Sequence, residues 1–247
     1  MLFKKDTFGH IVLLKKMLIT LLGAFTYPRL NWLNKLKVEG TEHLDKLDGC
    51  NVLFVSNHHT YFADVFAFFH VFCSSRWGFR NKINNPLYLL KPKSNIYYIA
   101  AEETMNAGLL PKIFAYTGSV SIKRTFREAG KDVNRQVDLK DISNIGKALT
   151  DGWVITFPQG TTTPFAKGRR GTVHIIKKYK PVVVPVVIDG FRTAFNKTGL
   201  KLKKTGTELS FKIKAPMDIN YEEDADTMLA KIMDAIEQSE KFQQNES

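Results

Sequence analysis

Cysteine is scarce in this chain of 247 residues, which carries only Cys50 and Cys73. They form no C-x-x-C pair and are too few for a disulfide framework, so a disulfide-stapled scaffold is excluded and a reducing compartment is indicated. Acidic residues are also few, 24 against 36 Lys and Arg, which gives a formal net charge of +12. This imbalance favours an anionic partner, such as nucleic acid, an anionic membrane surface or an acidic substrate.

Long hydrophobic runs are missing as well. The cleanest one, residues 17–27, has about half of the roughly 20 residues that a membrane-spanning helix needs. Lys15 and Lys16 interrupt the apolar stretch and no small-residue cleavage site follows, so we expect no cleavable signal peptide. With Lys15, Lys16 and Arg29 at its flanks, the run predicts an amphipathic helix lying in the membrane interface. The alternative is an amphipathic helix packed on the core.

Short apolar runs alternate with helical patterns along the remaining chain, and no repeat or low-complexity segment interrupts them. Strands are predicted within residues 37–44, 51–56, 94–103, 119–124, 153–158, 181–190 and 208–216, and helices within 8–36, 60–72, 108–118, 138–152, 172–179 and 224–242. This alternation predicts an α/β fold with a mixed, mostly parallel central sheet flanked by helices. We expect two parts: an N-terminal membrane-associating helical segment, 1–36, and one catalytic domain, 37–247.

Polar clusters follow three of the predicted strands. They are "SNHH" at 56–59, "KR" at 123–124 and "PQGTTT" at 158–163. Reactive groups in α/β sheets gather at strand ends and in the loops that follow. The three clusters therefore predict one active site at one edge of the sheet.

The stretch "VSNHHTYFADV", residues 55–65, carries the residues suited to general base catalysis. A histidine can deprotonate a hydroxyl nucleophile, and a carboxylate can fix its tautomer and stabilise the imidazolium. No G-x-S-x-G elbow supplies a serine nucleophile, so a dyad of Asp64 with His58 or His59 suits direct attack by the substrate's own hydroxyl.

Two other uses of these residues remain open. As metal ligands they would need a third or fourth protein ligand at a recognisable spacing, which His70 and His174 do not offer, and we expect no metal. As structural residues, the two histidines of this stretch would be satisfied by backbone groups.

Four motifs in order resemble those of the glycerolipid acyltransferases, typified by 1-acylglycerol-3-phosphate acyltransferase. The resemblance covers residues 37 to 216, from the lead-in "KVEGTEHL" onward. "SNHHTYFAD" resembles the histidine–aspartate motif, "GSVSIKR" at 118–124 the second motif, "FPQGTTTPFAKGRRGT" at 157–172 the third, and "VVVPVVI" at 182–188 the fourth. Each motif alone is weakly specific, whereas four in order are strongly specific.

The first motif departs from the family pattern. Family spacing places four residues between histidine and aspartate, which selects His59. The family's histidine directly follows Ser-Asn, however, and has Ser or Thr two places later, which selects His58 with Thr60. We favour His58 as the base and keep His59 open as the alternative base. The neighbouring histidine would then be a wall of the site or a helix-start contact.

The third motif departs as well. Gln159 stands where the family has Glu, and Thr162 where it has Arg; in the family both help to hold glycerol phosphate. The resemblance implies that Arg124 binds the acceptor's phosphate. Arg169 and Arg170 are further anion partners or a solvated loop. Gly160 and Thr161 are expected to line the substrate site, Gly160 by permitting a turn, with an ordinary turn as the alternative.

The resemblance implies a membrane-surface O-acyltransferase that moves a fatty acyl chain from an acyl thioester, acyl-CoA or acyl carrier protein, to the hydroxyl of a lyso-lipid. Lysophosphatidate is one expected acceptor. Gln159 and Thr162, in place of the family's Glu and Arg, make a lyso-aminoacyl lipid the alternative, with lysophosphatidate then a poor or secondary acceptor. The thioester is a co-substrate, and no other cofactor is expected. We expect a peripheral, monotopic enzyme on the cytoplasmic face.

Two other classes of function compete. A nucleic-acid-binding protein should show aromatics interleaved with Lys and Arg or a named module, and neither appears. A non-catalytic membrane lipid-binding protein would keep the helix and the apolar interior but has no need of a His–Asp dyad.

Overall fold

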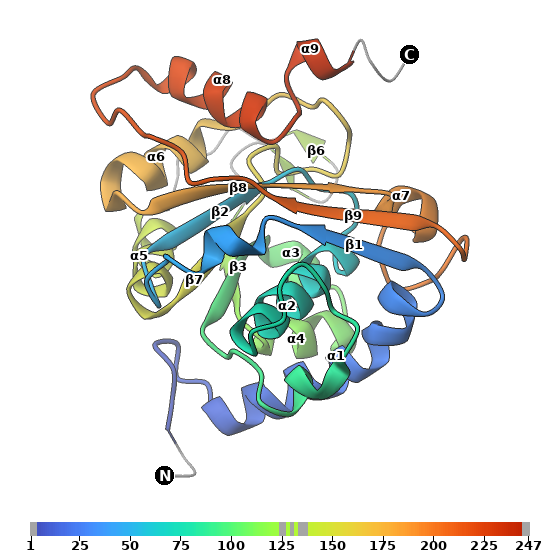
Figure 1. Cartoon of the computed structure of the whole chain (residues 1–247). Coiled ribbons are helices and arrows are strands. Elements are labelled where there is room, and N and C mark those ends of the chain that lie inside the picture. Colours follow the sequence, from blue (N-terminus) through green and yellow to red (C-terminus); the bar gives the residue numbers. More distant parts are fainter. Residues whose placement is uncertain (1–3, 124–126, 129–130, 133–137, 244–247) are drawn as a thin grey trace.

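A seven-stranded sheet forms the centre of the molecule (Figure 1) in the computed structural model, which describes residues 4–123, 127–128, 131–132 and 138–243. Its order is β1-β9-β8-β2-β7-β3-β4. The strands are β1 Lys35–Glu39, β2 Val52–Ser56, β3 Ile96–Ala101, β4 Ser119–Ile122, β7 Trp153–Thr156, β8 Val182–Asp189 and β9 Glu208–Ile213. All neighbours are parallel except β8 and β9, which confirms the predicted mixed, mostly parallel sheet. A separate pair, β5 Arg127–Glu128 and β6 Lys131–Asp132, is antiparallel.

Burial explains which runs became central strands. Every residue of β2 and of β7 is buried, as expected for parallel strands covered on both faces. The edge strand β1 and its neighbour β9 alternate between buried residues and exposed or half-buried ones, because only one of their faces meets the core. The apolar runs at 51–56 and 153–158 therefore lie in the middle of the sheet.

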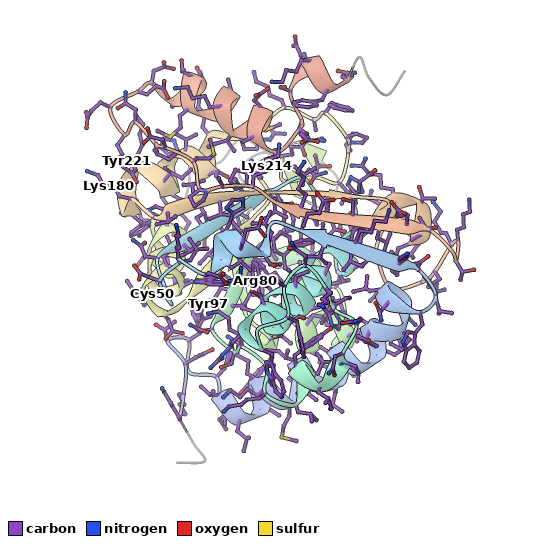
Figure 2. All side chains as sticks on the ribbon, in the orientation of Figure 1. Cys50, Arg80, Tyr97, Lys180, Lys214 and Tyr221 are labelled. Carbon is purple, nitrogen blue, oxygen red and sulfur yellow. The ribbon has the colours of Figure 1, made fainter. Side chains whose placement is uncertain are left out.

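Helices cover both faces of the sheet. Figure 1 shows α1 Val12–Asn31, α2 Ala63–Arg76 and α4 Leu109–Tyr116 on one side, and α6 Arg170–Tyr179 and α8 Ala225–Ala235 on the other. The helix α5 Leu139–Asp151 shares its apolar cluster with α6 and α8. The short helices are η1 Thr41–Leu44, η2 Pro86–Leu90, α3 Glu102–Met105, α7 Phe191–Ala194 and α9 Glu240–Gln243. Side chains fill the space between these layers (Figure 2).

The helix α1 differs from its prediction. The amphipathic character is not confirmed, because α1 has apolar side chains on both faces. Its inward face buries Lys15, Ile19, Gly23, Tyr27 and Leu30, and α1 contacts α2, η2 and β1. Its outward face exposes Leu13, Leu14, Met17, Leu21 and Phe25, which are between 41% and 64% exposed. Across the described residues, no helix has the length and apolar character needed to cross a bilayer.

The C-terminal helix is also interrupted. One helix was predicted over 224–242, but α8 ends at Ala235 and α9 begins at Glu240. Glu237 lies between them with φ of 58°, a backbone conformation that no helix interior adopts. Its carboxylate pairs with Lys214 (labelled in Figure 2) at 2.8 Å. The break places Gln238 against the loop that follows β7.

Candidate active site

Two of the three polar clusters, "SNHH" at 56–59 and "PQGTTT" at 158–163, meet at the carboxyl ends of β2 and β7, which are neighbours in the sheet. His58 follows β2, and Asp64 lies in the first turn of α2. The Nδ1 atom of His58 is 2.9 Å from Oδ2 of Asp64. Six positions separate the two residues, and the turn between them brings the carboxylate back to the imidazole.

Three further hydrogen bonds fix the Asp64 carboxylate. Its Oδ2 accepts the backbone N–H groups of His59 at 2.6 Å and Thr60 at 2.9 Å, and its Oδ1 accepts the Thr60 hydroxyl at 2.7 Å. Burial raises the pKa of this fully buried carboxyl. The hydrogen bond and charge of His58, the charge of His59 and the Thr60 N–H outweigh burial, so the pKa lies below its ordinary value. Asp64 is therefore a rigid anion at neutral pH.

The His58 ring lies on the wall of a cavity. It stacks on the Phe157 ring, with centroids 3.9 Å apart and planes 18° from parallel. Since Nδ1 points to Asp64, Nε2 is the nitrogen left for chemistry, and the carboxylate favours the tautomer with the proton on Nδ1. A neutral Nε2 beside a cavity has the geometry of a general base.

His59 has a different environment, although it is the neighbour of His58 in sequence. The His59 residue is buried, with 7% of its surface exposed, and it does not line the cavity. Its Nε2 is 3.3 Å from the Asn57 amide nitrogen. Burial, with a smaller contribution from Arg192, lowers the pKa of His59 to about 4. Only its backbone N–H contacts Asp64, so His59 matches the helix-start alternative.

The cavity has a volume of about 370 Å³, and most of its walls are apolar. It lies over the carboxyl ends of β2, β3 and β7 and against α5 and α6. Its apolar and aromatic lining includes Val65, Tyr98, Ile99, Met105, Ile122, Ile142, Ile145 and Ile175. A polar rim adds Lys123, Asp141, Arg169, Arg170 and His174. An apolar space with a cationic rim suits an acyl chain attached to an anionic group.

The predicted binding residues divide into three groups. Gly160, Thr161, Arg169 and Arg170 line the cavity together with His58. Gln159 and Thr162 do not line it. Arg124 lies outside the described residues, so its predicted role has no structural test.

Gln159 points into the protein instead of the cavity. It is 1% exposed, and its Nε2 donates to the Ala166 carbonyl at 3.0 Å and to Oε1 of Gln238 at 3.1 Å. The same Gln238 oxygen accepts the N–H of Phe165 at 2.9 Å. The amide therefore ties the loop after β7 to the C-terminal segment. Gly160 has φ of 64°, which fits its predicted turn.

In the arginine pair 169–170, Arg170 forms an ion pair with a residue of α8. Arg170 forms a two-bond contact with Asp226 of α8, from Nε at 2.8 Å and Nη2 at 2.5 Å. Both side chains are about two-thirds exposed, so the pair contributes little to stability. Asp226 already neutralises Arg170 on the α8 side of the rim.

Sequence reasoning missed two residues of the site. Arg192 donates from Nη2 to the carbonyl oxygens of His58, at 3.1 Å, and Thr162, at 2.8 Å, joining the two loops. Phe157 stacks on the His58 ring. Phe157 stood inside a recognised motif, but Arg192 follows the fourth motif by four positions, where no spacing rule pointed to it.

Within the described ranges, no group of three or more His, Cys, Asp and Glu residues could hold a metal ion. The chemistry available is that of an oriented imidazole beside an apolar cavity. A buried Asp–His dyad at the end of a central parallel strand, without a serine or cysteine among the cavity-lining residues, defines a class of enzymes in which a bound hydroxyl is activated directly.

The family follows from comparison with known proteins. The model of the Acyltransferase family matches residues 35–189, so this chain belongs to the Acyltransferase family and is an acyltransferase. The fold resembles the crystal structure of the 1-acyl-sn-glycerophosphate (LPA) acyltransferase PlsC from Thermotoga maritima, with a TM-score of 0.55 and 19% sequence identity over 91% of this chain and 77% of that chain. No curated protein sequence matches the chain significantly.

Proposed function

We propose that this acyltransferase transfers a fatty acyl chain from an acyl thioester to the hydroxyl of a lyso-lipid of the 1-acylglycerol-3-phosphate type. The observation that carries the proposal is the contact between His58 Nδ1 and Asp64 at 2.9 Å, with the ring on the wall of an apolar cavity. The PlsC resemblance in fold agrees with this substrate class.

In the proposed reaction, the acceptor hydroxyl attacks the thioester carbonyl carbon while His58 Nε2 takes the hydroxyl proton. Asp64 stabilises the imidazolium that forms. The tetrahedral oxyanion then collapses, the C–S bond breaks, and the imidazolium returns the proton to the leaving thiolate. The products are a diacyl lipid and a free thiol, so atoms and charges balance without a redox or metal cofactor.

The cavity's composition supports the two substrates. The apolar walls suit the acyl chain, and the cations of the rim suit a phosphate on the acceptor or the donor. Acyl-CoA and acyl carrier protein both carry negative charge, which complements the chain's formal net charge of +12. Both donors stay within the proposal.

A membrane-bound acceptor requires access to a lipid surface. We propose peripheral binding to an anionic membrane, on the cytoplasmic face. The outward apolar face of α1 supports the peripheral mode, because it exposes Leu13, Leu14, Met17, Leu21 and Phe25. The formal net charge of +12 supports an anionic surface. Apolar side chains inserted among acyl chains provide the attraction.

The lyso-aminoacyl lipid alternative depended on Gln159 and Thr162. Because neither side chain lines the cavity, their difference from the family pattern gives no support to a changed headgroup. We therefore propose an acceptor of the lysophosphatidate type.

The test is an acyl-transfer assay with purified protein, radiolabelled palmitoyl-CoA or palmitoyl acyl carrier protein, and lysophosphatidate in mixed micelles. We expect labelled phosphatidate with the wild type and almost none with Asp64→Asn. Lysophosphatidylglycerol and lyso-aminoacyl lipids serve as competing acceptors. If the protein binds the lyso-lipid but forms no labelled diacyl product with either donor, it is a lipid-binding protein instead.

A further inference from the structure

A second cavity lies at the amino ends of the strands, away from the active site. It has a volume of about 410 Å³ and includes Gly49, Asn95 and Trp153, which precede or begin β2, β3 and β7. The active-site cavity includes Phe157, four residues further along the same central strand. At about 3.3 Å per residue, that separation is roughly 13 Å.

Two cations face this second cavity. Lys93, which precedes β3, is buried, with 8% of its surface exposed. Arg76 lies at the last residue of α2. Both line the cavity, and the positive charge of Arg76 opposes that of Lys93.

No carboxylate among the described residues neutralises these two cations. The one acidic residue in the lining, Asp45, pairs with Arg80 (labelled in Figure 2). The Lys93 ammonium lies over the Trp153 ring, 3.9 Å from its centroid, and no described residue forms an ion pair with it. A lysine this buried is normally paired.

Burial is the main reason why the pKa of Lys93 falls to about 8, and Arg76 lowers it further. Cys73 and Cys50 (labelled in Figure 2) act in the opposite direction. A bound anion would offset both unfavourable contributions at once. The site thus has a strong electrostatic preference for a negative occupant.

From these contacts we propose that the second cavity is a binding site for a small oxyanion, a phosphate group, held between the ammonium of Lys93 and the guanidinium of Arg76 and distinct from the catalytic cavity. Arg76 supplies directed N–H donors that match phosphate oxygens, and Lys93 supplies a point charge. The group is either free inorganic phosphate or the phosphomonoester of a lipid headgroup, which present the same oxygens.

The experiment follows the titration of Lys93 by NMR in the full-length protein, with lysine labelled at Cε and Nζ. The probes are inorganic phosphate and, in a separate arm, vesicles of phosphatidylcholine with phosphatidate. An anion beside the ammonium raises the Lys93 titration midpoint, and we expect a rise of about one pH unit at saturation, equivalent to tenfold tighter proton binding. A rise with phosphate identifies the free ion as sufficient, and a rise with vesicles alone identifies the lipid headgroup.

Variants separate the site from the general positive field of the protein. Phosphate binding, measured by calorimetry, should be lost in Lys93→Gln and weakened about tenfold in Arg76→Gln. Lys46→Gln is the matched control, because it removes one exposed positive charge from the same region without altering the cavity lining. Equal losses in Lys46→Gln and Lys93→Gln would overturn the proposal.

Two safeguards keep the result interpretable. Near-ultraviolet circular dichroism establishes that each variant is folded, and the titration of Lys93 in the wild type needs no variant at all. An unchanged Lys93 midpoint with both phosphate and phosphatidate vesicles would overturn the site, whether or not the enzyme is active.

Discussion

Asp64 has most of the interactions that organise the active site at the scale of single residues. One carboxylate accepts two backbone N–H groups, one hydroxyl and the His58 imidazole. These contacts explain how Asp64 can lie six positions after His58, with one residue more between them than the family spacing has. The turn that contains the extra residue also donates its own N–H groups to the carboxylate.

The catalytic variants should separate the two histidines. We expect His58→Ala to reduce kcat by orders of magnitude, because it removes the base. Asp64→Asn should also reduce kcat by orders of magnitude, because the imidazole loses its tautomer control. His59→Ala keeps both groups and should retain activity, with a loss of stability from its buried volume. Acyl-transfer rates together with urea unfolding check this, and a His59→Ala protein that is folded but inactive would contradict the assignment.

Gln159 should affect stability more than acceptor choice. Gln159→Ala removes the donor to the half-buried Ala166 carbonyl and one of the two donors to Gln238 Oε1, a loss of about 0.5–1.5 kcal/mol for each hydrogen bond. We expect a lower free energy of unfolding and an unchanged ratio of kcat/KM for lysophosphatidate and lysophosphatidylglycerol. Gln238→Ala is the matched partner, and the double variant should lose less than the sum of both. A changed acceptor ratio with unchanged stability would return Gln159 to the substrate site.

At the scale of elements, α1 has a feature of each of the two helices that the sequence presented as alternatives. A packed helix and an interfacial helix were predicted as competing interpretations, yet α1 buries one apolar face and exposes another. Periodicity could not separate these cases, because a helix that is apolar on both faces has no polar side to reveal its orientation.

The outward face of α1 should govern membrane binding without affecting the fold. We expect Leu21→Ser with Phe25→Ser to weaken binding to anionic vesicles at least tenfold, since two large side chains lose their burial in the bilayer. Unfolding by urea should change little, because both residues are more than half exposed. Leu87→Ser, which changes one exposed leucine of η2, is a control, and vesicle sedimentation is the measurement. Undiminished sedimentation of the double variant would place the lipid contact elsewhere.

At the scale of the whole molecule, the sheet could be predicted better than the site. Apolar runs such as 51–56 and 181–190 determine buried strands whatever surrounds them, so the α/β class and the strand positions were predictable. The direction of a side chain in a loop depends on tertiary partners. Gln159 turns inward because Gln238 is present, and Gln238 is there because the chain breaks at Glu237. Arg192 was missed for the same reason, since its function is to join loops distant in sequence.

The stability of the whole molecule should fall with acid in a defined window. Burial lowers the pKa of His59 to about 4 and that of His70 to about 3, so both histidines stay neutral in the folded protein. Unfolded, they take up protons near pH 6.5. Between pH 6.5 and 4 the unfolded state therefore binds more protons, and stability is lost as the pH falls.

Each such histidine contributes a slope of up to about 1.4 kcal/mol per pH unit within that window. His70→Gln should reduce the slope, because glutamine can replace the hydrogen bonds to Thr26 and Tyr88 without titrating. Urea unfolding at half-unit steps from pH 7 to 4.5 measures it. The upper part of the window lies above the ordinary carboxyl pKa values of about 3.9–4.3, so the histidines dominate that part. A wild type with equal unfolding free energy at pH 6.5 and 4.5 would show that neither buried imidazole controls the acid limb. A His70→Gln variant with the wild-type slope would show that His70 does not contribute to it.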